Sequence, residues 1–523
     1  MCTSGRLYRF DHSEPERLSV PVLVHRFRSI AARTSAMAAT AAMAMAVMPI
    51  RTSTSLLPAT RHVSPRAQSR RCAYRRIETS SSLQYSLQSE LKNEVQWGEF
   101  ESLRVGGIQG GRKKMDIHAL ANQINPATET PPAMKKVLVP VANGTEEMEA
   151  VIVIDVLRRA GATVTVASVE DGKQIKASRG VNLLADCLVS DCEAEDYDLV
   201  VLPGGMPGAE RFRDSEVLKR ITEKQVKEKR MFAAICAAPV VALQSWRLLE
   251  GLHATCHPSF ASKLEDKAAV ESSVVRDSLL TTSRGPGTAF DFALALVEQL
   301  YGAEKVPSVA GPMVLPPEDG TDCRAVKFND EEWSTMSSTP TVLVPIANDS
   351  EEMEVVIIVD VLRRAGVKVV VASVELEKTI IASRSVQLIA DVLISEVMDT
   401  QFDLVLLPGG MPGADRLKKS AELCKILNEQ ADEGRCYGAI CAAPAVVLES
   451  IGLLQSKKAT SHPAFSNKLS DQSVVESRVV IDGRVITSRG PGTAMEFTLN
   501  VVEKLCSRVK AQEIGEAMVF DYL

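Results

Sequence analysis

Histidine and aromatic residues are scarce in this sequence. It contains 7 His among 523 residues, and Phe, Trp and Tyr together make up 4%. Residues 135–523 contain only His253, His257 and His462, with no short-spaced Cys-His cluster. Because zinc and nickel sites draw on several closely spaced nitrogen and sulfur ligands, we expect no metal and no other cofactor.

Long basic runs and long apolar runs are also missing. The net charge is −6, and the first 133 residues hold 18 Lys or Arg against 10 Asp or Glu, so the acidic excess lies in the rest of the chain. Binding to nucleic acid needs a positive surface that neutralises phosphates, which argues against such a partner. The Ala- and Met-rich run at 36–48 is too short for a membrane span, so we expect no membrane partner.

Acidic residues are absent between Arg17 and Ile77, where Arg, Ser, Thr and Ala are abundant. This composition is typical of an organelle transit peptide. We predict a disordered transit peptide at 1–80 and a linker at 81–134. The predicted location is the chloroplast (plastid stroma), with the mitochondrion as the alternative. Met37 is an alternative start, since a complete transit sequence follows it.

What the sequence does contain is a duplication. The heptapeptide AAICAAP occurs at Cys236 and again at Cys441, 205 residues later, and the surrounding segments align at the same offset without a gap. An ungapped duplication longer than a hundred residues indicates two complete domains of one fold. We place these domains at 135–318 and 340–523, joined by a linker at 319–339.

The cysteines do not form a paired framework. Of the 11 in the chain, only Cys236 and Cys441 occupy matching positions in the two repeats. A structural disulfide would be duplicated with its domain, so we expect free thiols in a reducing compartment. The other cysteines of the repeats, each with the residue at the matching position, are Cys187 (Val392), Cys192 (Val397), Cys256 (Ser461), Cys424 (Lys219), Cys436 (Met231) and Cys506 (Tyr301).

Each repeat alternates apolar, β-rich runs with helical segments. A helix is predicted from about Glu146 to Ala160. The strand-like runs of the first repeat are 137–142, 163–170, 197–205 and 231–236. Strands that alternate with helices form a parallel sheet covered on both faces. The predicted α/β fold of each repeat is therefore a flavodoxin-like three-layer α/β/α sandwich, like the class I glutamine amidotransferases, with a mostly parallel sheet and ligand sites at the carboxyl ends of the strands.

Cys236 and Cys441 stand where an apolar strand stops and a helix begins. The flanking alanines permit a sharp turn that would expose the sulfur at the carboxyl edge of the sheet. Free N–H groups at a helix N-terminus stabilise thiolate, so we predict a nucleophilic cysteine with a pKa below its usual value of about 8.5. The alternative is a buried, inert cysteine.

A glycine pair precedes each cysteine in the loop PGGMPGA. Its backbone N–H groups, at Gly204 and Gly205 and again at Gly409 and Gly410, are unobstructed by side chains. They are suited to form an oxyanion hole that also binds substrate. Tight turns demand such glycines as well.

The segment EEME places three acids at the start of the first helix of each repeat. Acids there complement the helix dipole, which accounts for Glu146 and Glu147. Glu149, like Glu354 at the matching position, flanks the apolar stripe and could turn toward the cysteine. A carboxyl group beside a thiolate keeps its proton, because two nearby anions repel, and can donate it. The residues alone do not choose among the three acids.

His257 and His462 follow their cysteines by 21 residues. A lone histidine is usually structural, and no third group is assigned to orient either ring as a base. Their matching positions nevertheless make both candidate catalytic residues.

Four arginines are candidates for binding a substrate or a carboxylate-bearing product. Arg179 and Arg384 lie in the ASR segments, and Arg284 and Arg489 lie in TSRGPGT. Surface ion pairs are the alternative interpretation of all four.

The motifs AAICAAP, EEME, LPGGMPGA, HP and TSRGPGT together closely resemble the DJ/PfpI superfamily, in particular its DJ-one branch, the Parkinson disease protein family. The tandem fusion behind a transit-like leader is similar to plant members of that branch. The resemblance implies a flavodoxin-like fold and a reactive cysteine hydrogen-bonded to a protonated glutamate. Carried over by position, it implies the pairs Cys236–Glu149 and Cys441–Glu354, the oxyanion glycines Gly205 and Gly410, and the pocket histidines His257 and His462.

Two departures limit this resemblance. In the protease-like and chaperone branches a His follows the nucleophile, whereas Ala237 and Ala442 occupy that position here, so a Cys-His-acid peptidase triad is not supported. The family also implies dimers in which a proline from the partner's C-terminal tail touches the pocket. Pro312 stands at this position in the first repeat and Ala517 in the second. We expect the two repeats to form an intramolecular pseudo-dimer, with a homo-oligomer left open.

The activity implied by the resemblance is that of a cofactor-independent, glutathione-independent glyoxalase, an enzyme of the lyase or hydro-lyase type. It would convert methylglyoxal or glyoxal to lactate or glycolate, with protein deglycase activity alongside, in protection from oxidative and carbonyl stress. A cysteine hemithioacetal, a proton-moving glutamate and an oxyanion glycine support this chemistry. The alternative is a redox-sensing stress-protective protein that forms a cysteine sulfinate, or a chaperone-like protein that needs neither cysteine.

Overall fold

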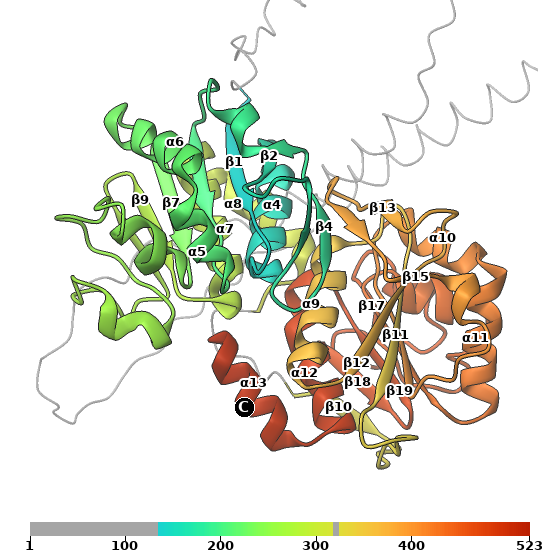
Figure 1. The fold of residues 1–523 in the computed structure, drawn as a ribbon. Coiled ribbons are helices and arrows are strands. Elements are labelled where there is room, and N and C mark those ends of the chain that lie inside the picture. Colours follow the sequence, from blue (N-terminus) through green and yellow to red (C-terminus); the bar gives the residue numbers. More distant parts are fainter. Residues whose placement is uncertain (1–133, 317–323, 523) are drawn as a thin grey trace, which may run out of the picture. The chain divides into compact units, whose positions relative to one another are not determined.

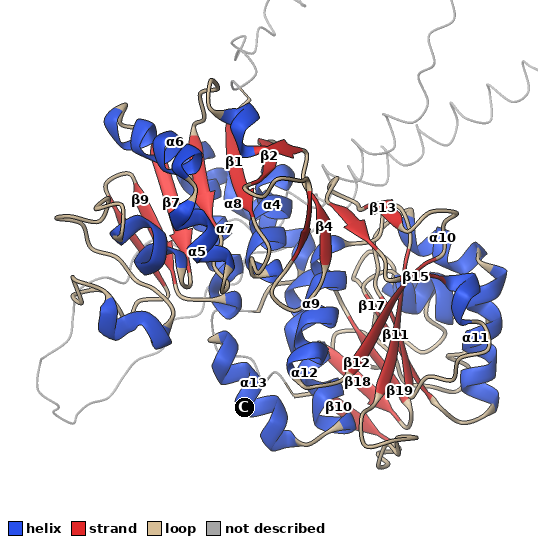
Figure 2. Cartoon of the chain, in the orientation of Figure 1, coloured by secondary structure: helices blue, strands red, loops and turns tan. Residues whose placement is uncertain are grey.

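The computed structural model describes residues 134–316 and 324–522, which form two α/β domains in tandem (Figure 1). Strands with helices beside them make up each domain (Figure 2), which confirms the predicted fold class. The predicted transit peptide at 1–80 lies outside the described residues, as does the predicted linker at 81–134 except for its last residue.

The first repeat is built on a seven-stranded sheet with the order β5-β2-β1-β6-β7-β9-β8. Neighbouring strands are parallel except β8 and β9, which are antiparallel. The strands are β1 (Lys136–Val141), β2 (Thr163–Ser168), β5 (Cys187–Leu188), β6 (Leu199–Leu202), β7 (Met231–Ile235), β8 (Val274–Asp277) and β9 (Leu280–Ser283). The carboxyl ends of the parallel strands β1, β6 and β7 therefore meet at one edge of the sheet.

Helices alternate with the strands of this sheet along the chain. They are α4 (Glu147–Ala160), α5 (Gly208–Asp214), α6 (Glu216–Lys227), α7 (Ala289–Tyr301) and α8 (Val306–Ala310). Shorter helical turns are η1 (Val189–Cys192), η2 (Pro239–Gln244), η3 (Pro258–Lys263), η4 (Pro286–Thr288), η5 (Ala303–Lys305) and η6 (Gly311–Met313). In the described part of the chain every helix is too short or too polar to cross a lipid bilayer.

Helix α4 occupies the predicted segment, and its ends have identifiable causes. The Glu146 side chain caps it by accepting a hydrogen bond from the Glu149 N–H at 2.7 Å. Gly161 ends it with φ 98°, a left-handed conformation that glycine adopts without strain. Arg158 and Arg159 in the last turn complement the negative end of the helix dipole. The cap, the glycine stop and the charged end residues therefore define the same helix that the apolar spacing predicted.

The second repeat has the same topology with one more strand, in the order β10-β18-β19-β17-β16-β11-β12-β15. Its strands are β11 (Thr341–Ile346), β12 (Lys368–Ser373), β15 (Val392–Leu393), β16 (Leu404–Leu407), β17 (Cys436–Ile440), β18 (Val479–Asp482) and β19 (Val485–Ser488). Its helices are α9 (Glu352–Arg364), α10 (Gly413–Lys419), α11 (Ala421–Asp432), α12 (Ala494–Leu505) and α13 (Arg508–Met518). The shorter turns are η7 (Ile394–Val397), η8 (Pro444–Leu448), η9 (Ser466–Lys468) and η10 (Pro491–Thr493).

The additional strand, β10 (Val326–Phe328), lies within the segment 319–339 that we predicted as a linker. It pairs in parallel with β18 at the edge of the second sheet. After it, Trp333 is buried, and its indole N–H donates to the Gly483 carbonyl at 2.9 Å. The described part of this segment is fixed to the second repeat because it covers a sheet edge and buries a large aromatic ring.

The two repeats contact each other through helices and strands. Helix α4 packs against α9. Strand β4 (Asn182–Leu184) of the first repeat pairs antiparallel with β14 (Gln387–Ile389) of the second. With β3 (Gln174–Lys176) and β13 (Thr379–Ile381) they form one four-stranded sheet in the order β13-β14-β4-β3. These contacts support the predicted intramolecular pseudo-dimer.

Candidate active site

Each candidate nucleophile directly follows a central strand, Cys236 after β7 and Cys441 after β17. Both have φ 64°, in the left-handed region that costs a non-glycine residue energy. Hydrogen bonds hold this turn. The Cys236 N–H donates to the Ser283 carbonyl at 3.0 Å, and its carbonyl accepts from the His257 N–H at 2.9 Å. The sharp turn that we predicted at the carboxyl edge of the sheet is confirmed.

Glu149 is the acid of the EEME segment that reaches the cysteine. It is fully buried, and its Oε2 accepts a hydrogen bond from the Gly204 N–H at 2.7 Å. A Cβ added at Gly204 would lie 2.6 Å from the Cys236 Cβ and 2.8 Å from Glu149 Oε2. Residue 204 must therefore be glycine, because thiol and carboxyl pack against its backbone from two sides.

The second repeat reproduces this arrangement. Glu354 is fully buried, and its Oε2 accepts from the Gly409 N–H at 2.7 Å. A Cβ at Gly409 would lie 2.5 Å from the Cys441 Cβ and 3.0 Å from its Sγ. Both repeats thus bring the predicted cysteine and glutamate together.

The glutamates hold a proton under conditions in which an ordinary glutamate is ionised. In the described structure the Oε1 atoms of Glu149 and Glu354 are buried and have no hydrogen-bond partner. A buried carboxylate oxygen without a donor is strongly unfavourable. Burial raises the pKa of Glu149 to about 7, although the Gly204 N–H and the nearby Cys236 thiol oppose this shift. Burial likewise raises the pKa of Glu354 well above its usual range. Because Oε2 accepts from the glycine N–H, Oε1 is the oxygen left to carry the proton.

The pKa of the cysteine shifts against our prediction. Burial and the charge of an ionised Glu149 raise the pKa of the Cys236 thiol, and the Gly205 N–H lowers it only in part. The pKa of Cys441 is raised for the same reasons. The next helical turn, η2, begins at Pro239, which has no N–H, and the Gly205 N–H is the backbone donor that lowers the pKa of the Cys236 thiol. Thiolate and carboxylate disfavour each other, so at most one member of each pair is ionised at a time.

The paired glycines have different roles. The N–H groups of Gly204 and Gly409 are bound to the glutamates, so they do not serve the oxyanion hole as we predicted. The Gly205 and Gly410 N–H groups are hydrogen-bonded to the sulfurs and lower the pKa of those thiols. Gly205 has φ 88°, and a Cβ there would lie 2.3 Å from the Glu146 nitrogen. One N–H per site is therefore positioned for an oxyanion.

The predicted catalytic histidines lie at the site, but both of their ring nitrogens are engaged. His257 Nδ1 accepts from the Ser259 backbone N–H at 3.2 Å, which leaves the ring proton on Nε2. Nε2 donates to the Ala517 carbonyl of the second repeat at 3.2 Å. Burial lowers the pKa of His257, which favours this neutral form. The ring holds a tail of the other repeat, and it is not free to act as a base.

His462 has the same role in the second site. Its Nδ1 accepts from the Ala464 N–H at 3.1 Å, and its Nε2 donates to the Pro312 carbonyl of the first repeat at 3.0 Å. Burial lowers the pKa of His462 as well. The tail positions that we singled out, Pro312 and Ala517, are therefore the ones that reach the opposite sites.

Each cysteine lines a small cavity to which both repeats contribute. The cavity at Cys236 has a volume of about 290 Å³ and also touches Arg364 and Ala517 of the second repeat. The cavity at Cys441 has a volume of about 220 Å³ and touches Arg159 and Pro312 of the first. Each site is completed by the other repeat.

Two largely buried arginines form ion pairs between the repeats at these cavities. Arg364 donates to Glu146 of the first repeat at 2.8 Å and also pairs with Asp360 on its own helix. Arg159 donates to Glu351 of the second repeat at 2.6 Å. The charge of Arg364 lowers the pKa of Glu149, so a residue of one repeat tunes the acid of the other. Sequence reasoning missed both arginines, because a basic pair at a helix end is already explained by the dipole.

Arg179 and Arg384 line the two cavities. Glu147 fixes the first of these loops by accepting two contacts of 3.0 Å from the Arg179 backbone N–H, and Glu352 binds the Arg384 N–H in the same way. In the described residues neither guanidinium forms an ion pair. Both residues therefore lie at the cavities, and binding of a substrate or product by them stays a prediction.

Arg284 and Arg489 instead form ion pairs. Each binds a largely exposed glutamate, Glu271 or Glu476, at 3.0 Å. For Arg284 and Arg489 the structure therefore shows the alternative that we gave in the sequence analysis, an ion pair at the surface.

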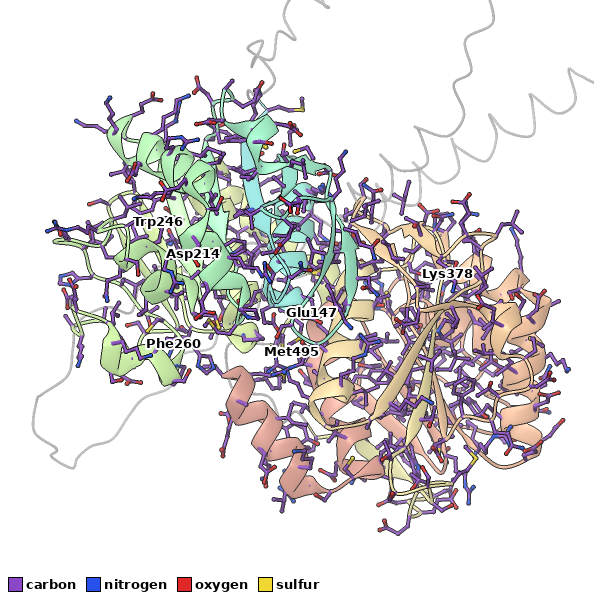
Figure 3. All side chains as sticks on the ribbon, in the orientation of Figure 1. Glu147, Asp214, Trp246, Phe260, Lys378 and Met495 are labelled. Atoms are coloured by element: carbon purple, nitrogen blue, oxygen red, sulfur yellow. The ribbon has the colours of Figure 1, made fainter. Side chains whose placement is uncertain are left out.

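The two sites differ in ways that the motifs do not show. Ser259 places its hydroxyl 2.8 Å from His257 Nδ1, whereas alanine stands at the matching position beside His462. Phe260, labelled in Figure 3, lines the first cavity, as its counterpart Phe465 lines the second. Sequence reasoning did not select these residues, since nothing marks a Ser or Phe after HP as part of a pocket.

Comparison with known proteins agrees with this geometry. Residues 135–299 and 340–504 each match the sequence profile of the DJ-1/PfpI family. Protein DJ-1 homolog B of Arabidopsis thaliana is 50% identical over 384 residues, covering 73% of this chain and 87% of that protein. Protein DJ-1 homolog A of the same plant is 49% identical over 385 residues, covering 73% and 98%. The Caenorhabditis elegans protein named glutathione-independent glyoxalase DJR-1.2 is 36% identical over 166 residues, covering 31% and 87%. The chain belongs to the DJ-1/PfpI family and carries two domains of that family in tandem.

Proposed function

We propose that each repeat is a glutathione-independent glyoxalase that converts methylglyoxal or glyoxal to lactate or glycolate. The observation that carries this proposal is the buried Glu149 carboxyl, which lies next to the Cys236 thiol and whose Oε1 lacks an N–H or O–H partner among the described residues. A movable proton next to a sulfur nucleophile is what an aldehyde isomerisation requires. The adjoining cavity of about 290 Å³ is of a size for a small aldehyde.

The first step forms a hemithioacetal. The reaction starts from the pair with one group ionised. The Cys236 sulfur attacks the aldehyde carbon, the carbonyl electron pair moves to oxygen, and that oxygen takes the one remaining proton of the Cys236–Glu149 pair. The Gly205 N–H, directed at the sulfur, stabilises the negative charge that develops on the oxygen. Glu149 is left ionised, and its unpaired Oε1 becomes a base.

Glu149 then moves two protons in turn. It transfers the proton of the former aldehyde carbon to the neighbouring carbonyl oxygen, which gives an enediol. It next moves the hydroxyl proton of the first carbon to the second carbon, which gives a thioester of the 2-hydroxy acid. Water hydrolyses the thioester, which releases the acid and restores the thiol. A carboxyl whose pKa lies near 7 is suited to both transfers.

Arg179 and Arg384 are proposed to bind the carboxylate product, because each lines a cavity with a guanidinium that lacks an ion pair in the described structure. Protein deglycase activity would use the same pair: the sulfur displaces the amine from the hydroxyl-bearing carbon of the adduct, the C–N bond breaks, and the amine leaves with a proton from the pair. Because a glycated side chain belongs to another protein, it can reach the cysteine only through a cavity that is open to solvent.

The test is methylglyoxal turnover by the full chain, followed by lactate formation. Cys236→Ser with Cys441→Ser should abolish turnover, and so should Glu149→Gln with Glu354→Gln. The matched control is Cys424→Ser, a half-buried thiol outside both cavities, which should leave turnover unchanged. Retained lactate formation in the double serine variant would refute the proposal.

A redox-sensing role is the second candidate, and one observation favours it. The Gly205 N–H and a protonated Glu149 both face the sulfur, so they could also hydrogen-bond a sulfinate. Gln at position 149 keeps a donor but cannot act as a base. Under this candidate, Glu149→Gln loses turnover yet still accumulates Cys236 sulfinate after mild peroxide, as measured by mass spectrometry.

We also propose import into plastids, from the acid-free composition before Ile77. A fluorescent fusion carrying residues 1–80 should enter plastids, and removal of those residues should leave the protein outside. Entry into mitochondria alone would favour the alternative location.

A further inference from the structure

Two thiols outside both active sites lie close together in the first repeat. Cys187, on edge strand β5, and Cys192, at the end of turn η1, have their Sγ atoms 3.5 Å apart and are not bonded to each other. Cys192 is 2% exposed, whereas Cys187 is only partly buried. One sulfur of the pair is therefore accessible to a reagent, and the other is sheltered behind it.

The second repeat shows that packing does not require these sulfurs. Val392 and Val397 occupy the matching positions on β15 and η7, and Val397 is buried as Cys192 is. Two apolar side chains thus satisfy the same fold at the same place. The dithiol is an addition specific to the first repeat.

We propose that Cys187 and Cys192 form a redox-active dithiol that closes to a disulfide on reaction with a low-molecular-weight disulfide such as oxidised glutathione. The Cys187 sulfur attacks the reagent, whose S–S bond breaks and releases one reduced thiol. The Cys192 sulfur then attacks the Cys187 sulfur of the mixed disulfide and releases the second reduced thiol. The protein loses two hydrogens and two electrons, and the reagent gains them.

The geometry favours ring closure. Closing the bond requires the sulfurs to approach from 3.5 Å to about 2.05 Å, which is a side-chain movement. Cys192 lies at the end of a short turn, five positions after Cys187, so the two residues stay together while a mixed disulfide forms. The buried Cys192 is held ready as the resolving thiol.

The neighbouring acids argue for disulfide chemistry over a metal site. Asp186 Oδ2 accepts from the Val166 N–H at 2.9 Å, and Asp191 Oδ2 accepts from the Leu188 N–H at 3.1 Å. Both carboxylates are used by the backbone. Within the described residues the pair belongs to no group of three or more potential metal ligands.

Burial and the contact with Cys192 raise the pKa of Cys187 to about 12, so little of this thiol is ionised at neutral pH. The thiolate is the attacking form, so the first step with the reagent is slow. The disulfide should therefore form slowly, and an added dithiol should reduce it.

The full chain is incubated with oxidised glutathione, free thiols are alkylated, and the peptide containing residues 187–192 is examined by mass spectrometry. We expect a peptide short by two hydrogens, without a glutathione adduct, that dithiothreitol restores. Cys192→Val should trap glutathione on Cys187, because the resolving thiol is gone. Cys187→Val with Cys192→Val, which copies the second repeat, should fold normally and show no modification.

A variant that adds the two cysteines to the second repeat tests the same chemistry without any change to the first repeat. Val392→Cys with Val397→Cys should create a second, matching disulfide. The proposal fails if both wild-type thiols remain open to alkylation, if glutathione stays on Cys187, or if either residue bonds to another cysteine. None of these outcomes depends on the glyoxalase reaction, so this proposal and that one can fail separately.

Discussion

Gly204→Ala is the most incisive single change at the first site. The new Cβ would lie 2.6 Å from the Cys236 Cβ and 2.8 Å from Glu149 Oε2. Carbon atoms in contact are normally at least about 3.5 Å apart, so the thiol or the carboxyl must move by about 1 Å. A misplacement of that size costs about 10²-fold in rate. The overpacking itself should cost about 1–3 kcal/mol of stability.

The assay isolates one site. In a Cys441→Ser background only the first repeat turns over methylglyoxal, and kcat and KM are measured beside the thermal unfolding curve. We expect kcat to fall about 10²-fold with little change in KM, since the displaced groups act in the chemical step. The matched control is Gly172→Ala, whose Cβ would meet nothing within 4 Å. If Gly204→Ala retained the parent kcat, or if the control lost as much, our account of the thiol–carboxyl contact would be wrong.

Three further predictions follow from the buried charges and the exchanged tails. Burial raises the pKa of Glu149 from 4.5 to about 7, so the stability linked to its proton is fully present below pH 4.5 and is lost as the pH rises through 7. The unfolding free energy of Glu149→Gln, measured in urea and taken relative to the parent protein, should therefore be about 3 kcal/mol higher at pH 8.5 than at pH 4. An equal difference between variant and parent at both pH values would contradict this. Arg364→Ala should lower turnover at the first site and Arg159→Ala at the second, because each arginine lines the cavity of the opposite repeat. Each site is measured with the cysteine of the other site replaced by serine. If either variant lowered turnover equally at both sites, the arginines would not act on the opposite site alone. Gly287→Ala would place a Cβ 2.2 Å from the Val519 carbonyl oxygen, so it should displace the C-terminal tail and speed its removal in limited proteolysis.

Much of the fold could be predicted because local signals and the repeat agree. The apolar spacing, the Glu146 cap and the Gly161 stop define α4 without any tertiary information. The Ala-flanked cysteines were predicted at strand ends and are found there. The sequence did not predict that the described part of the 319–339 linker packs on the second repeat, because the burial of Trp333 depends on a sheet edge formed by residues 479–482.

The candidate site was predicted less completely. Which acid faces the thiol depends on the orientation of α4 against the sheet; the residues alone left three acids open, the family resemblance implied Glu149, and the structure places Glu149 there. The thiol pKa was predicted in the wrong direction, because the distances that set desolvation and charge repulsion are tertiary. His257 was predicted as catalytic, whereas its ring holds Ala517 of the other repeat.

The sequence by itself determined that there are two copies of one α/β domain, that each has a cysteine after a central strand, and that glycines and acids accompany it. These features follow from hydrophobic period, turn chemistry and the ungapped repeat, all of which are local. Only the tertiary structure supplied the burial that lets Glu149 and Glu354 keep the proton that the resemblance implied, and only it placed an arginine of the opposite repeat at each site. Protonation and shared sites depend on burial and on contacts between residues far apart in the chain, which no local pattern encodes.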